Sequence, residues 1–81
     1  MKIKVFFFAT LRDIVGEKNI DLEFPPKATI KDLKETLIKM YPRLKAVMKT
    51  VLVAINHEYG FDESSLPDGA EVAIFPPVSG G

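Results

Sequence analysis

One amphipathic segment, preceded and followed by strand-like segments, restricts the folds open to this chain most strongly. Residues 30–41 carry apolar side chains three and four positions apart, with lysines on the other side. Thr29 fits the N-cap position and Asp32 follows three residues later, an aspartate variant of the capping box. Pro42 cannot continue a helix, so we expect the helix to end at Tyr41 or just before it. The apolar positions are Ile30, Leu33, Leu37 and either Met40 or Tyr41.

Four segments alternate in side-chain character with the period of a strand: residues 2–8, 18–24, 51–56 and 71–75. The connection between the first two is short and contains a helical turn that ends at Gly16, so we expect them to pair antiparallel. A further short strand is expected at residues 59–61. This order predicts an α+β roll of the β-grasp type, with a mixed four- to five-stranded sheet and one main helix packed on one face.

The first and last strands are expected to carry aromatic side chains on the sheet face turned away from the core. The core face of the first strand holds Ile3, Val5 and Phe7. Its other face changes from lysine to phenylalanine along the strand, and we expect the fold to cover Phe6 and to leave Phe8 more open. In the last strand, alternation turns Phe75 outward.

The absence of cysteine and the presence of a single histidine exclude several kinds of site. Without cysteine, this chain cannot form a disulfide, a thiolate nucleophile or a thiolate-bound metal site. His57 alone cannot supply a histidine-rich metal site or a Ser-His triad. We interpret His57 as a solvated turn residue and expect no metal site.

Charge and hydropathy restrict the partners. Eleven basic residues balance eleven acidic ones, whereas a nucleic-acid-binding module normally has a net basic face, so we expect no nucleic-acid partner. No run of 18 apolar residues is present and residues 1–4 do not resemble a signal peptide, so we expect no membrane partner and a cytoplasmic location.

The C-terminal block is the most distinctive stretch of the chain and reads Phe75-Pro76-Pro77-Val78-Ser79-Gly80-Gly81. The two prolines end sheet bonding and favour an extended backbone, and glycine allows other groups to approach the chain closely. We therefore divide the chain into a domain of residues 1–75 and a flexible, extended tail of residues 76–81, which can deliver the α-carboxylate of Gly81 into a narrow channel. A frayed terminus without function is the alternative.

Several stretches give the whole chain its resemblance to a known family: Val5-Phe6-Phe7-Phe8-Ala9, Leu11-Arg12, Gly16, Val53-Ala54-Ile55-Asn56, Glu58-Tyr59, Leu66, residues 68–73 and the C-terminal block. In these stretches the chain resembles the ubiquitin-like sulfur carriers, and most closely the MoaD-like small subunits of molybdopterin synthase. The C-terminal block is the most specific match. Ala70 is a departure, because the family commonly has an acidic residue there.

The resemblance implies a carrier without catalytic side chains of its own, which leaves open whether the chain counts as an enzyme. In the family, a ubiquitin-activator-like adenylating enzyme uses ATP to join AMP to the terminal glycine carboxylate, and a sulfur donor protein converts it to a thiocarboxylate. The tail then enters the large subunit, within a heterotetramer, and gives sulfur to cyclic pyranopterin monophosphate in molybdenum or tungsten cofactor biosynthesis. The chain itself is expected to bind no cofactor.

The resemblance also assigns roles to particular residues. Gly81 carries the chemistry as carboxylate, acyl-adenylate and thiocarboxylate. The partner-binding residues are Phe8, Tyr59 and Phe75. The tail that presents Gly81 consists of Pro76, Pro77, Val78, Ser79 and Gly80.

Other functions stay open at this point. Relatives with the same terminal Gly-Gly carry sulfur for thiamine synthesis or tRNA thiolation, although the thiamine carriers tend to be shorter and to lack Phe-Pro-Pro. A ubiquitin-like modifier that forms isopeptide bonds with target lysines begins with the same acyl-adenylate. A plain binding module would leave the C-terminal block unexplained.

Overall fold

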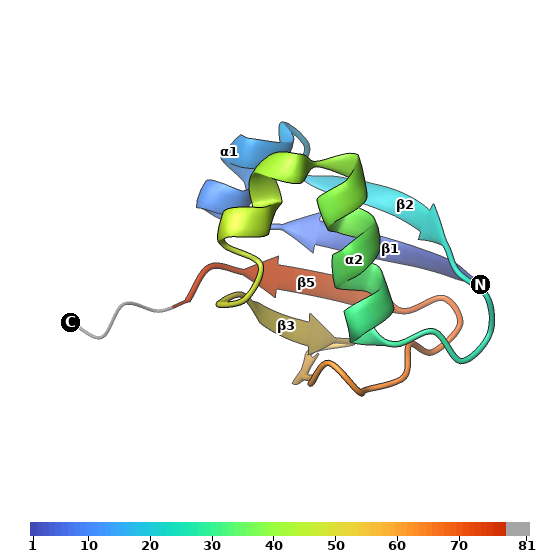
Figure 1. The fold of residues 1–81 in the computed structure, drawn as a ribbon. Helices are drawn as coiled ribbons and strands as arrows, with labels where there is room; N and C mark the ends of the chain where they lie inside the picture. Colours follow the sequence, from blue (N-terminus) through green and yellow to red (C-terminus); the bar gives the residue numbers. More distant parts are fainter. Residues whose placement is uncertain (78–81) are drawn as a thin grey trace.

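The strand and helix patterns of the sequence form two layers, a sheet and a helix that crosses one of its faces, in the computed structural model of the chain (Figure 1). The structure describes residues 1–77. The strands are β1 (Lys2–Phe7), β2 (Asn19–Glu23), β3 (Leu52–Ile55), β4 (Glu58–Tyr59) and β5 (Glu71–Phe75). The helices are α1 (Thr10–Val15), α2 (Ile30–Met40) and the 3₁₀ helix η1 (Pro42–Ala46).

The sheet has five strands in the order β2-β1-β5-β3-β4. β1 pairs antiparallel with β2, as expected, and parallel with β5 in the centre of the sheet. β5 pairs antiparallel with β3 on its other side. The predicted α+β fold of the β-grasp type, with a mixed sheet and one main helix on one face, is confirmed.

Helix α2 begins and ends where the sequence predicts. The Thr29 Oγ1 accepts the Asp32 backbone N–H at 3.4 Å, and the Asp32 carboxylate accepts the Thr29 backbone N–H at 2.9 Å, so both halves of the capping box are present. Tyr41 is the C-cap, and its ring packs edge-on against Phe7 with the ring centroids 6.3 Å apart. Met40 is 46% exposed, so Tyr41 is the residue that continues the apolar face of the helix.

The core lies between α2 and the sheet face that meets it. Leu33 and Leu37 of α2 are fully buried, together with Ile3 and Val5 of β1 and Val72 of β5. Complete burial of a leucine, isoleucine or valine side chain contributes about 1.5–3 kcal/mol, so this layer is the main source of stability. The inward side chains of β1 and β5 are those that strand alternation predicts.

The prediction of a strand at residues 59–61 is wrong in its bounds, because the strand ends at Tyr59. The Phe61 N–H is taken by the Ser64 Oγ at 2.9 Å, and the chain turns there toward α2. The Asp62 carbonyl then accepts the Lys31 N–H at 3.0 Å. This bond satisfies one of the backbone donors that the first turn of a helix leaves unpaired.

After β5 the chain continues into the predicted tail. Pro76 is half-buried and Pro77 is exposed, and both lie within the described residues. The predicted tail residues Val78, Ser79, Gly80 and Gly81 lie outside them. Within residues 1–77, no helix combines the length and the apolar character that crossing a bilayer requires.

Candidate functional site

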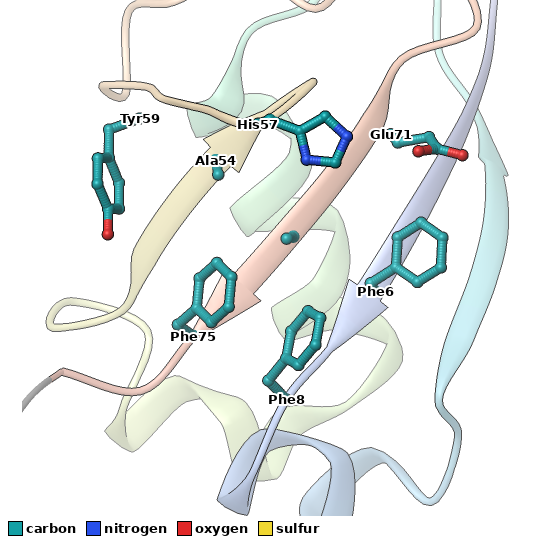
Figure 2. A pocket seen from close by; sticks show the side chains of 8 residues that line it. Phe6, Phe8, Ala54, His57, Tyr59, Glu71 and Phe75 are labelled. Carbon is teal, nitrogen blue, oxygen red and sulfur yellow. The ribbon is translucent and has the colours of Figure 1, made fainter.

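The sheet face opposite α2 contains a shallow groove with a volume of about 420 Å³ (Figure 2). We call it the aromatic groove and define it by its lining residues Phe6, Phe8, Ala54, His57, Tyr59, Glu71, Ala73 and Phe75. No polar or charged side chain is buried among residues 1–77. The aromatic groove is therefore the feature of the described residues that most clearly indicates a site, because exposed apolar patches mark interaction surfaces.

Strand register explains the shape of the groove. Phe6 of β1, Ala73 of β5, Ala54 of β3 and Tyr59 of β4 are consecutive cross-strand neighbours, so they form one row on this face. The two alanines in the middle of the row are small, whereas the residues at its ends are aromatic. The row is therefore low in the centre and high at both sides, and Figure 2 shows Phe6 and Tyr59 on opposite sides of it.

The next row carries a stacked aromatic pair. The rings of Phe8 and Phe75 lie 4.7 Å apart, centroid to centroid, with an angle of 15° between their planes. The Phe8 N–H also donates to the Ile74 carbonyl at 3.3 Å, which extends the β1–β5 pairing to this point. Stacked pairs of this kind contribute about 0.5–1.5 kcal/mol beyond their buried area, so each ring holds the other in place.

The structure brings together the three residues predicted to bind partners. Phe8 is 42% exposed and Tyr59 is 74% exposed, while Phe75 is half-buried, and all three line the aromatic groove. Their role in binding stays a prediction. The fold covers Phe6 only in part, because Phe6 is half-buried and lines the same groove. It is less exposed than Phe8, as expected.

The tail leaves the domain beside these rings. A second hollow of about 450 Å³ adjoins the groove and is lined by Phe8, Ala9, Leu52, Tyr59, Phe75, Pro76 and Pro77. The stacked pair Phe8 and Phe75 contributes to both hollows, as does Tyr59. The two described tail residues therefore begin directly at the aromatic surface.

A tight turn between β3 and β4 forms one end of the groove. Both central residues have positive φ, 48° for Asn56 and 74° for His57, as a type I′ hairpin turn requires. Asn56 fixes this turn to β5, because its N–H donates to the Glu71 carbonyl at 2.8 Å and its Oδ1 accepts the Glu71 N–H at 2.9 Å. His57 is exposed in a turn, as predicted.

Sequence reasoning did not place His57, Glu71, Ala54 or Ala73 at the groove, and it expected Phe6 to be covered. Alternation along each strand gave the signal that Ala73 shares a face with Phe75. The missing information was the pairing of β1 with β5 and of β5 with β3, which no local pattern contains.

Replacing His57 with glycine should stabilise the domain by about 1 kcal/mol, because glycine adopts a positive φ without strain and favours the second position of a type I′ turn. The matched change Asn56→Gly should lower stability, since it removes the Oδ1 bond to Glu71. Urea denaturation of both variants measures the two effects. A His57→Gly variant no more stable than the original chain would contradict this account of the turn.

Side chains that can bind a metal do not gather in the described part of the chain. Among residues 1–77, no three His, Asp or Glu side chains lie together in a way that could hold a metal ion.

Comparison with known proteins agrees with the fold and with the C-terminal block. Residues 5–81 match the model of the ThiS family. The molybdopterin synthase sulfur carrier subunit of Chlamydomonas reinhardtii is 43% identical, and the match covers 100% of both chains.

Solved structures give the same result. The putative molybdopterin converting factor subunit 1 of Pyrococcus furiosus has a TM-score of 0.86 and 32% identity over 95% of this chain and 98% of that one. The small archaeal modifier protein 1 of Methanosarcina acetivorans has a TM-score of 0.81 and 28% identity over 99% and 96% of the two chains. The chain therefore belongs to the ThiS family, and its predicted resemblance to the MoaD-like, ubiquitin-like proteins is confirmed.

Proposed function

We propose that this chain is a sulfur carrier that acts as the small subunit of a molybdopterin synthase. Relatives that match its whole length, among them two at 43% and 35% identity, bear the name molybdopterin synthase sulfur carrier subunit. A protein named as a subunit works together with a second chain. For this chain we propose the large subunit as that partner, within a heterotetramer.

The observation that supports the proposal is that the aromatic groove lies where the tail begins, at the end of β5. β5 runs through the centre of the sheet and ends at Phe75, which lines the groove, and Pro76 follows beside it. Six residues, 76–81, follow Phe75, and a chain of that length reaches at most about 20 Å. A partner that binds the groove therefore receives the C-terminus within about that distance of the contact.

The chemistry proposed for Gly81 needs activation from outside, because a carboxylate is a poor acceptor of nucleophiles. An adenylating enzyme joins the Gly81 carboxylate to the α-phosphate of ATP and releases pyrophosphate, which leaves an acyl-adenylate. The outer sulfur of a persulfide on a donor protein then attacks the acyl carbon and displaces AMP, and a thiol reduces the resulting acyl disulfide, which releases the thiocarboxylate and the donor. The absence of cysteine fits this scheme, since the sulfur is carried on the C-terminus and not on a side chain.

Intact mass spectrometry tests the proposal directly. After incubation with the adenylating enzyme, ATP and a sulfur donor, the mass of the chain should rise by about 16 Da, because sulfur replaces one oxygen of the activated carboxylate. The charged protein should then yield molybdopterin with the large subunit and cyclic pyranopterin monophosphate. A thiocarboxylate that forms without any molybdopterin would assign the carrier to another sulfur acceptor, such as the thiamine or tRNA pathways. No mass shift would overturn the carrier role.

A second candidate function is protein modification. It is favoured by the similarity to the small archaeal modifier protein 1 of Methanosarcina acetivorans, whose name describes a modifier. Both functions start from an acyl-adenylate at Gly81 and differ in the final acceptor, which is a lysine amine in a modifier. Lysine conjugates of high mass, formed in place of molybdopterin, would favour the modifier.

A further inference from the structure

The charged side chains of the open sheet face do not balance. By strand alternation and register, this face carries Lys2, Lys4, Asp21, Glu23 and Glu71. Across the β1–β2 ladder, Lys2 lies opposite Glu23 and Lys4 lies opposite Asp21, with 3.9 Å between the Lys4 Nζ and the Asp21 Oδ1. Two lysines thus face three carboxylates, and the surplus negative charge belongs to the carboxylate at the groove, Glu71.

The position of Glu71 is fixed, but its carboxylate has no cationic partner among residues 1–77. Its N–H and its carbonyl both bond to Asn56, so the backbone beneath the side chain is held at both polar groups. Within residues 1–77, no lysine, arginine or histidine nitrogen lies within ion-pair distance of the Glu71 carboxylate. Lys4 lies opposite Glu71 in the β1–β5 pairing, but its ammonium group pairs with Asp21 on β2.

The polar end of the groove has a second component. His57 lines the groove beside Glu71, and Figure 2 shows its ring on the same side of the sheet as the Glu71 carboxylate. A guanidinium group that enters here has a carboxylate to bond and an imidazole ring to stack on, a combination that suits arginine. The rest of the groove offers alanine and aromatic surface, which suits an apolar side chain.

We propose that Glu71 is a specificity-determining residue of the aromatic groove, and that it binds an arginine or lysine side chain of the protein whose apolar side chain fills the groove next to it. This inference rests on the proposed function, in which the groove docks a partner protein. Covering a carboxylate without pairing it is costly, so a partner that lacks a basic group at this position is rejected. The charge at one end also fixes the direction in which the partner lies along the groove.

Titration of the molybdopterin synthase large subunit with variants of the full chain tests the proposal. Glu71→Gln should raise the Kd about 5- to 30-fold, because a charge-assisted bond is lost. Glu71→Lys should raise it further and slow association, with a smaller effect at high salt. The matched control is Glu23→Lys, which makes the same charge change on the same face in the β2 edge strand, where Glu23 lies opposite Lys2, and should change the Kd less than about twofold.

Three results separate this inference from the proposed function. If the Glu71 variants bind like the original chain while Phe75→Asp does not bind, the role of Glu71 is overturned and docking at the groove stands. If Glu23→Lys weakens binding as much as Glu71→Lys, the effect is one of overall charge and the specific role is again overturned. If the original chain binds neither the large subunit nor the adenylating enzyme, both proposals fail. Glu23 and Glu71 are exposed and Phe75 is half-buried, and a thermal melt of each variant verifies its folding.

Discussion

Deletion of Gly81 should reduce sulfur transfer at least about 100-fold while the domain still folds. The deletion moves the terminal carboxyl group back by about 3.5 Å, and misplacement of a reacting group by about 1 Å costs about 100-fold in rate. All core residues of the described part of the chain lie between Ile3 and Ile74, so the deletion removes none of their side chains. The measurement is the yield of molybdopterin from the truncated chain after incubation with the adenylating enzyme and a sulfur donor.

The control for this deletion keeps the length of the tail. Ser79→Ala leaves Gly81 at the same position in the sequence and should transfer sulfur within a few-fold of the original chain. The melting temperatures of both variants should equal that of the original protein. Transfer by the truncated chain within tenfold of the original would contradict the assignment of the chemistry to Gly81.

Replacing Phe75 with aspartate should weaken binding to both the large subunit and the adenylating enzyme by about 100-fold or more. Phe75 lines both hollows and stacks on Phe8, so it has the central position and the aromatic character typical of residues that dominate binding. Aspartate removes the ring and places an unpaired charge where the partner excludes water. Titration calorimetry with each partner measures the two dissociation constants.

The same change should leave the domain folded, and a second phenylalanine provides the matched control. Loss of the stacked ring of the half-buried Phe75 costs about 1–3 kcal/mol, less than the 5–15 kcal/mol typical of a folded domain. Phe61 is 75% exposed and lines neither hollow, so Phe61→Asp should change neither constant more than about twofold. Unchanged binding of both partners by Phe75→Asp would remove the docking role of the groove.

Local patterns in the sequence predicted the elements and their inward faces. The start and end of α2 follow from Thr29, Asp32 and Pro42, because capping and proline geometry act within a few residues. Alternation identified the buried side of β1 and β5 for the same reason, since side-chain direction in a strand has a period of two. The bounds of the short strand near Tyr59 were predicted wrongly. The strand ends before Phe61, whose N–H bonds to the Ser64 side chain, and alternation of side chains cannot predict this bond.

The sequence by itself determined the chemistry available to this protein. It has no cysteine, one histidine and a C-terminal Phe-Pro-Pro block that ends in Gly-Gly, and these residues favour a carrier that acts through its terminus.

Only the tertiary structure decided which surface lies beside the end of β5, where residues 76 and 77 leave the sheet. The parallel pairing of β1 with β5 brings Phe8 against Phe75, and the pairing of β5 with β3 places Ala73 beside Ala54 at the floor of the groove. The two hydrogen bonds between Asn56 and Glu71 then hold Glu71 at one end of the groove. Strand alternation gives the face on which a side chain lies but not its neighbour across the sheet, which depends on contacts between segments far apart in the chain.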